Sequence, residues 1–276
     1  MAQAASENSC RGKYATPEAG SNATPVSSMR NPDNLAPLLV SVRDQHEAAA
    51  VAHLPFEILD LKEPDRGPLG ACEPDVWHHC VESIPPLAGG SLKGRCWSVA
   101  LGEQTMAMEL VGQVPSGVRF AKAGPSGLPD TRLLFRMWDR LRERLAEGVE
   151  LVAVAYADWE VARSPLLEDV VAGAVSCGLK TILIDTFDKQ RGGVFDLLGE
   201  DRIKNVIRMT SSVGCEVVLA GGITYSEASR ALSFGYRRIG LRGALCRGSR
   251  NGEIDPQTVS QWSETFLRHP VGEQSN

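Results

Sequence analysis

The sequence contains no apolar run of the roughly 20 residues that a membrane-spanning helix needs. Its first 34 residues are rich in Ala, Ser, Asn, Pro and Gly, and they lack the apolar core of a secretory signal peptide. We therefore expect a protein that neither spans a membrane nor carries a signal peptide. This part of the chain is typical of a disordered extension, and a short ordered arm on a partner subunit is the alternative.

Paired cysteines and metal-binding spacings are also missing. The seven cysteines are odd in number and far apart, and none forms a C-x-x-C motif. This usage is typical of a reducing cytoplasm, where thiols serve as small apolar side chains. His78 and His79 are the only close histidine pair, and adjacent helical residues point in different directions. We therefore predict a cytoplasmic protein with no metal site and no cofactor.

Charge of one sign is not in large excess. The net charge is -5 and the pI is about 5.6, which excludes a general attraction to nucleic acid or to anionic membranes. Any phosphate must then be bound by local cations. We expect a small phosphorylated molecule as the partner, and a homo-oligomer is compatible with the sequence although no surface patch identifies one.

What the sequence does contain, after residue 36, is an alternation of apolar runs and helical patterns. Eight runs are typical of buried strands, at residues 38–42, 56–62, 96–101, 118–123, 151–156, 181–185, 216–220 and 238–241. Eight strand–helix units in about 240 residues are typical of one closed α/β barrel of the TIM (β/α)8 type. We therefore predict a disordered extension at 1–35 and a catalytic barrel domain at 36–276. A doubly wound open sheet is the alternative, but no G-x-G-x-x-G motif follows the first strand.

The clearest helical pattern covers residues 130–147. Leu133, Met137, Leu141 and Leu145 recur every four residues, and arginines occupy other faces. This pattern predicts an amphipathic helix that packs on the barrel through these four side chains, with the arginines in solvent.

Three lysines lie in or just after apolar runs near predicted strand ends, namely Lys62, Lys122 and Lys189. Because the carboxyl ends of barrel strands converge on one mouth, we expect these side chains to meet there. Partial burial and a second cation nearby both lower a lysine pKa, which gives a neutral amine that can attack a carbonyl group. The alternative is that each lysine only forms an ion pair that stabilises the mouth.

Acidic and phenolic side chains accompany the lysines. Asp60 shares a face with Lys62 because side chains alternate along a strand, and Asp185 ends the sixth predicted strand. Tyr156 and Asp158 lie at the end of the fifth. We predict that Asp185 takes part in catalysis with the lysines. Asp60, Tyr156 and Asp158 are predicted to bind substrate.

Glycines end the seventh and eighth predicted strands. Gly221 and Gly222 follow one, and Arg242 and Gly243 follow the other. Phosphate sites recur at this place in barrels because backbone N–H groups point at the anion, and an arginine adds a forked contact. We predict that these four residues bind phosphate, and tight turns that need glycine are the alternative. The basic loop at 247–252 can close over the phosphate or stay solvated.

Short motifs in a fixed order make the chain resemble a known family. These are Leu38-Leu-Val-Ser41, Asp60-Leu-Lys62-Glu-Pro64, Leu69-Gly-Ala71, Lys122 with Gly124, Tyr156-Ala-Asp158, Leu183-Ile-Asp185-Thr186 with Lys189, Leu219-Ala-Gly221, Gly240-Leu-Arg-Gly-Ala244 and Arg250-Asn-Gly252. The chain is similar, from about Leu38 to Val259, to the (5-formylfuran-3-yl)methyl phosphate synthase family. That family makes the furan precursor of methanofuran.

The resemblance implies a barrel lyase that condenses two molecules of glyceraldehyde 3-phosphate and loses phosphate and water. It also implies that Lys62 forms a Schiff base and that Lys122 transfers protons. Asp185 and Lys189 match other active-site polar residues of the family. The family's usual Asp-Val-Lys-Asn-Pro reads Asp-Leu-Lys-Glu-Pro here, a departure that concerns loop shape more than chemistry.

Two other functions fit the same residues. A class I aldolase or a sugar-phosphate isomerase would use the same lysines, and its product would be a sugar phosphate without a furan chromophore. A sugar-phosphate sensor with a degenerate site would bind substrate without consuming it, but none of the motif lysines is missing.

Overall fold

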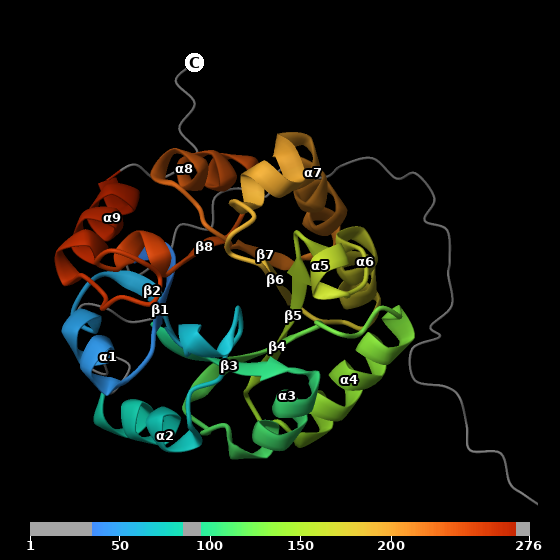
Figure 1. Ribbon diagram of the computed structural model, residues 1–276, viewed down its shortest axis with the longest axis horizontal. Helices are drawn as coiled ribbons and strands as arrows, with labels where there is room; N and C mark the ends of the chain where they lie inside the picture. The colour runs from blue at the N-terminus through green and yellow to red at the C-terminus, as the bar shows by residue number, and fades with distance from the viewer. Residues whose placement is uncertain (1–34, 85–94, 269–276) are drawn as a thin grey trace, which may run out of the picture.

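Eight parallel strands close into a barrel in sequential order, and the helices surround it, as seen down the barrel in Figure 1. The computed structural model describes residues 35–84 and 95–268. The strands are β1 (Ala36–Val42), β2 (Phe56–Leu61), β3 (Cys96–Glu103), β4 (Val118–Gly124), β5 (Glu150–Tyr156), β6 (Thr181–Asp185), β7 (Glu216–Leu219) and β8 (Arg238–Leu241). The predicted (β/α)8 barrel is confirmed. The predicted extension falls, apart from Leu35, outside the described residues.

The helices of the described residues follow the strands in sequence and lie outside them in space. They are α1 (Gln45–Val51), α2 (Pro74–Ser83), α3 (Gln104–Leu110), α4 (Thr131–Arg144), α5 (Trp159–Ala162), α6 (Leu167–Ser176), α7 (Val194–Thr210), α8 (Tyr225–Phe234) and α9 (Pro256–Arg268). The sequence did not predict the one-turn helix α5. None of these helices is both long and apolar enough to cross a bilayer.

Helix α4 differs from its predicted packing. Leu134, Met137, Trp138 and Leu141 are the side chains it buries, whereas Leu133 is 43% exposed. A step of four residues overshoots a 3.6-residue turn by about 40°, so a strict four-residue repeat drifts off the buried face. The buried set follows the mixed three- and four-residue spacing instead, and the prediction for Leu133 was wrong.

Two apolar layers explain why the strands read as nearly continuous hydrophobic runs. The larger layer lies between the strands and the helices. A smaller one fills the barrel interior and includes Leu39, Ile58, Phe120, Leu183 and Val218. Both faces of each strand are therefore buried, as in other parallel sheets.

The interior layer also fixes which polar side chains reach the mouth. Side chains alternate along a strand, so the residue two positions after an inward apolar side chain points inward as well. Ser41 follows Leu39 in this way, and Lys122 follows Phe120. The alternation thus turns a few strand-end positions towards the barrel axis, just above an apolar floor.

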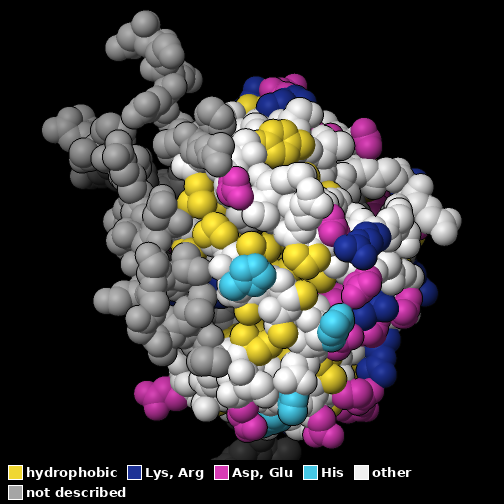
Figure 2. Space-filling view, turned by 90° about the vertical axis from the view of Figure 1, so that its left-hand side faces the viewer, with side chains coloured by type: hydrophobic (Ala, Val, Ile, Leu, Met, Phe, Trp, Pro, Cys, Tyr) yellow, Lys and Arg dark blue, Asp and Glu magenta, His cyan; other side chains and the backbone are white. Residues whose placement is uncertain are grey.

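The outer surface carries charge of both signs. On the face in Figure 2, which shows the left-hand side of Figure 1, acidic and basic side chains lie close together beside a group of hydrophobic ones. Among the described residues no group of three or more His, Cys, Asp or Glu side chains is arranged to hold a metal ion.

Candidate active site

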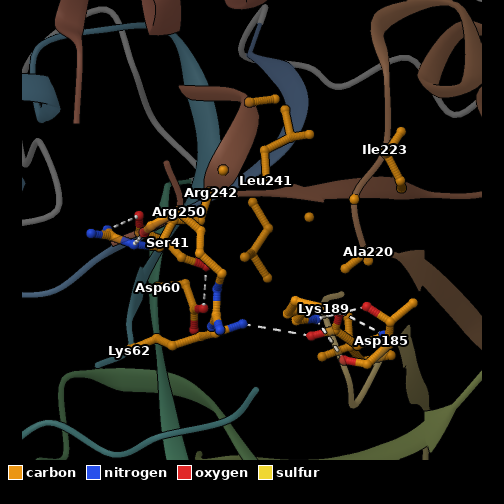
Figure 3. Close-up of a pocket in the computed structure, with 18 of the residues that line it drawn as sticks. Ser41, Asp60, Lys62, Asp185, Lys189, Ala220, Ile223, Leu241, Arg242 and Arg250 are labelled. Carbon is orange, nitrogen blue, oxygen red and sulfur yellow. Dashed lines mark hydrogen bonds and ion pairs between the residues drawn. The ribbon is translucent and has the colours of Figure 1, made fainter. Parts of the chain in front are cut away.

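A cavity of about 480 Å³ opens at the carboxyl ends of the strands. This volume lies within the roughly 300–1,000 Å³ typical of small-molecule sites. The predicted site residues that line it are Asp60, Lys62, Lys122, Asp185, Lys189, Gly221, Gly222, Arg242 and Gly243. The fold thus brings together nine residues from five segments of the sequence. Figure 3 shows Asp60 and Lys62 on one side of this space and Asp185 and Lys189 on the other.

Asp60 connects β1, β2 and β4 at the base of the cavity. Its two carboxylate oxygens accept separate hydrogen bonds, from Ser41 Oγ at 2.8 Å and from Lys122 Nζ. Asp60 and Lys122 are almost completely buried. Burial lowers the pKa of Lys122, although the negative charge of Asp60 opposes this effect. A lysine held in this way can exchange a proton with a neighbouring group at moderate cost.

Asp185 is the second buried carboxylate, and two lysines share it. Lys189 Nζ donates to Asp185 Oδ1 at 2.5 Å, and Lys62 Nζ lies 3.5 Å from Asp185 Oδ2. Burial alone would raise the pKa of Asp185, but the positive charges of Lys189 and Lys62 outweigh it and lower the pKa to about 2. Asp185 is therefore ionised at neutral pH and holds two amines over the cavity.

Lys189 is the most fully hydrogen-bonded of the three amines. In addition to Asp185, its Nζ donates to the carbonyl oxygen of Thr186 at 2.6 Å and to Thr186 Oγ1 at 3.0 Å. Three acceptors match the three N–H groups of an ammonium ion. Burial lowers the pKa of Lys189 to about 8, against the attraction of Asp185.

The amine of Lys62 has the most freedom. Within the described parts of the chain it makes no hydrogen bond, and its nearest carboxylate oxygen is the one 3.5 Å away on Asp185. Lys122 and Lys189, by contrast, donate to carboxylates at hydrogen-bond distance. A nucleophile needs an accessible lone pair, and the geometry favours Lys62 for that role.

Arg242 lines the cavity, but its guanidinium is engaged by the protein. It forms a buried, forked ion pair with Glu47 of α1, at 2.8 and 3.2 Å. Its remaining N–H groups donate to the carbonyl oxygens of Ser41, Arg250 and Gly252. The predicted contact between Arg242 and phosphate would require some of these five bonds to break, and it stays a prediction. Glu47 could not be predicted as its partner from local sequence patterns, because the two residues lie 195 positions apart.

Tyr156 and Asp158 do not line the cavity. The Tyr156 hydroxyl donates to Glu103 Oε1 at 2.6 Å, and Asp158 accepts the backbone N–H groups of Phe187 and Asp188. These contacts favour a supporting role for both residues, in which Asp158 shapes the segment between Asp185 and Lys189. Direct substrate binding by either residue stays a prediction.

Glu103 is a half-buried acid that sequence analysis missed. It ends β3, and its carboxylate also accepts the backbone N–H of Ser126. Burial raises the pKa of Glu103, against the effect of the hydrogen bond from Tyr156. Strict alternation would place Glu103 on the same face of β3 as Leu101, two residues earlier. The register between β3 and β4 shifts at this point, so Glu103 does not follow the alternation seen in the other strands.

The glycines after β7 take conformations that other residues adopt rarely. Gly221 and Gly222 both have positive φ, at 97° and 67°. A Cβ at Gly221 would lie 2.9 Å from the backbone nitrogen of Thr186, so only glycine fits. Thr224 then caps α8 in a capping box with Glu227. The turn brings backbone close to the cavity, and phosphate binding by these glycines stays a prediction.

Comparison with known proteins agrees with the motif pattern. A family model described as 4-HFC-P synthase matches residues 38–263. A (5-formylfuran-3-yl)methyl phosphate synthase of Methanopyrus kandleri is 29% identical over 83% of this chain and 98% of its own length. The protein of that name from Methanococcus aeolicus is 30% identical over 81% of this chain and 97% of its own.

Among solved structures, the barrel is similar to that of phosphoribosyl anthranilate isomerase from Thermus thermophilus. The TM-score is 0.52 at 11% identity, over 84% of this chain and 96% of the other, a likeness that concerns the fold alone. The family match includes residues of all eight strands and all the residues that line the cavity. The chain belongs to the 4-HFC-P synthase family.

Proposed function

We propose that this protein is a (5-formylfuran-3-yl)methyl phosphate synthase acting in the biosynthesis of a methanofuran-type cofactor. It condenses two molecules of glyceraldehyde 3-phosphate into a furan aldehyde phosphate, with release of one phosphate and of water. The observation that carries the proposal is the set of three lysines and two buried carboxylates around one cavity. The names of the relatives support the choice of this product over an aldolase or isomerase product.

Lys62 starts the reaction as the nucleophile. Its neutral amine attacks the aldehyde carbon of one triose phosphate, and loss of water gives an iminium ion. The positive nitrogen withdraws electrons and makes the neighbouring C–H more acidic. Among the described residues the amine of Lys62 makes no hydrogen bond, which leaves it accessible to the aldehyde carbon.

Lys122 and Asp60 form the proton-transfer pair. They are hydrogen-bonded to each other and line the cavity beside Lys62. A base here can remove the acidified proton, and the resulting enamine carbon can attack the second aldehyde. Ser41 keeps Asp60 oriented through its hydrogen bond.

Lys189 and Asp185 act on leaving groups. An ammonium ion next to the cavity can protonate a departing hydroxyl group or neutralise a departing phosphate. Asp185 keeps Lys189 in position and in its charged form. Hydrolysis of the iminium ends the sequence, because water restores the aldehyde of the product and frees the amine of Lys62.

Borohydride trapping tests the proposal. Incubation with glyceraldehyde 3-phosphate and borohydride is expected to add one reduced triose phosphate to Lys62, located by peptide mass spectrometry. Ultraviolet absorbance follows the furan product without borohydride. Furan formation without any label on Lys62 contradicts the assigned nucleophile. A free ketose phosphate in place of the furan would instead favour the aldolase or isomerase function.

The activity is expected to fall as pH rises through about 8. Lys189 has a pKa of about 8 and must be protonated to act as an acid, so the active fraction is complete below that pH and lost above it. Asp185, Lys62 and Arg250 all influence this pKa. The pH profile of kcat/KM is the measurement. In Lys189→Arg, which stays charged, the limb near pH 8 should disappear, and an unchanged limb would assign it to another group.

A further inference from the structure

The loop after β8 has a defined shape that a core ion pair maintains. Cys246 and Ile254 form an antiparallel bridge at its base. Between them, the carbonyl oxygens of Arg250 and Gly252 accept hydrogen bonds from Arg242, at 2.8 and 3.2 Å. The ion pair with Glu47 fixes the position of Arg242, and Arg242 in turn fixes the backbone of Arg250 through its hydrogen bond.

The tip of this loop reaches across to the loop after β2. Arg250 Nη2 donates to the carbonyl oxygen of Gly67 at 3.3 Å, and Asn251 Nδ2 donates to Asp65 Oδ1 at 2.6 Å. Arg250 also lines the catalytic cavity and is half-buried. In Figure 3 it enters from the same side as Ser41 and Arg242. Its guanidinium therefore lies between the loops after β8 and β2, at the edge of the cavity.

Arg250 differs from the other cations of the cavity in its partners. Of the five lysines and arginines that line the cavity, Lys62 and Lys189 share Asp185, Lys122 pairs with Asp60, and Arg242 pairs with Glu47. Within the described ranges 35–84 and 95–268, Arg250 has no carboxylate within 4 Å, since its one contact is the carbonyl oxygen of Gly67. It is the cation of this cavity that is free to pair with an anion on a ligand.

We propose that Arg250 is the side chain that recognises the phosphate group of the substrate, and that Arg242 is its positioning residue. This inference rests on the proposed function and names the substrate class that the site selects, which is phosphorylated aldehydes over unphosphorylated ones. The planar guanidinium presents a fork of N–H groups that suits phosphate oxygens. From the sequence alone, the loop at 247–252 either closes over the phosphate or stays solvated. The arginine predicted from the sequence to contact the phosphate is Arg242.

The backbone next to Arg250 is open enough for an anion. Gly243 and Ala244 line the cavity and are exposed, and a Cβ at Gly243 would lie 3.5 Å from Arg250 Cβ. The base of the Arg250 side chain and this backbone therefore lie side by side at the edge of the cavity. A phosphate there leaves the aldehyde end of a triose free to extend towards Lys62.

Paired measurements on Arg250→Gln test the proposal. Inorganic phosphate binding is measured by calorimetry, and reductive labelling of Lys62 is measured with glyceraldehyde 3-phosphate and with glyceraldehyde. The variant is expected to bind phosphate about 10- to 150-fold more weakly, the range of a charge-assisted hydrogen bond. The preference for the phosphorylated aldehyde over the unphosphorylated one should fall by a similar factor. Arg250→Lys is expected to restore part of both.

Arg247→Gln is the matched control. Arg247 lies on the same loop, is exposed and pairs with Asp255 away from the cavity, so phosphate affinity and aldehyde preference should both match those of the unaltered protein. Equal loss of labelling for the two aldehydes in Arg250→Gln would mean a structural role and overturn the proposal. So would unchanged phosphate binding. A third outcome is that Arg250→Gln loses phosphate binding while Lys62 is not labelled in any form of the protein. That result would support Arg250 as an anion site and refute only the Schiff-base function.

Discussion

Replacing Lys62 with alanine is expected to lower kcat/KM for furan formation by at least about 10³-fold, because no other amine of the cavity is free to form the iminium. Lys122 and Lys189 remain hydrogen-bonded to Asp60 and Asp185 in the variant. Fold and stability should change little, since Asp185 keeps its closer partner. Product absorbance measures the loss, and circular dichroism checks the fold.

Two further variants separate nucleophilicity from charge. Lys62→Arg keeps a positive charge beside Asp185 but has a pKa too high to supply a neutral amine, so it should be as inactive as Lys62→Ala. Lys180→Ala removes an exposed lysine before β6, on the opposite end of the barrel, and should retain full activity. Substantial turnover by Lys62→Arg would show that Lys62 contributes only charge.

The second large effect concerns stability. Arg242→Leu is expected to lower the free energy of unfolding by about 3–5 kcal/mol, because it leaves the carboxylate of Glu47 buried without its cation. Denaturant unfolding at pH 7 measures the loss. Burial favours the neutral form of Glu47 and the ion pair with Arg242 outweighs it, so the pKa of Glu47 is lowered in the intact protein. In Arg242→Leu the ion pair no longer opposes the effect of burial. The loss of stability should therefore be smaller at acidic pH, where Glu47 takes up a proton and loses its charge.

The double variant Arg242→Leu/Glu47→Leu provides the control. Replacing both partners by apolar groups removes the unpaired charge, so stability should recover relative to Arg242→Leu alone. A single variant as stable as the unaltered protein would mean that water reaches Glu47. No recovery in the double variant would assign the loss to the backbone hydrogen bonds of the pair instead, which are those of Arg242 to three carbonyl groups and those of two backbone N–H groups to Glu47.

The barrel could be predicted because its signals are local. Each strand is a short apolar run between helical patterns, and each run ends within two residues of its predicted end. The convergence of Asp60, Lys62, Lys122, Asp185 and Lys189 followed from the fold alone, since parallel strands end at the same mouth.

The pairing of charges could not be predicted in the same way. Which lysine shares Asp185, and which arginine binds Glu47, depends on barrel register and on loop paths far apart in sequence. Sequence analysis predicts a phosphate contact for Arg242 because Arg242 follows a strand-end glycine, and that local pattern carries no information on the hydrogen bonds that its N–H groups make to other segments. The prediction for Tyr156 rests on its place at a strand end, and its hydrogen bond to Glu103 of β3 depends in the same way on contacts between strands.

The two-residue alternation that turns Asp60 and Lys62 towards the barrel axis has an evolutionary consequence. Inserting or deleting one residue within β2 would rotate both side chains out among the helices and bring Leu59 and Leu61 to the reaction centre. Single substitutions at the mouth leave this geometry intact. New chemistry on this scaffold is therefore accessible through point mutations and loop-length changes, whereas a change in the length of β2 would remove the reaction centre.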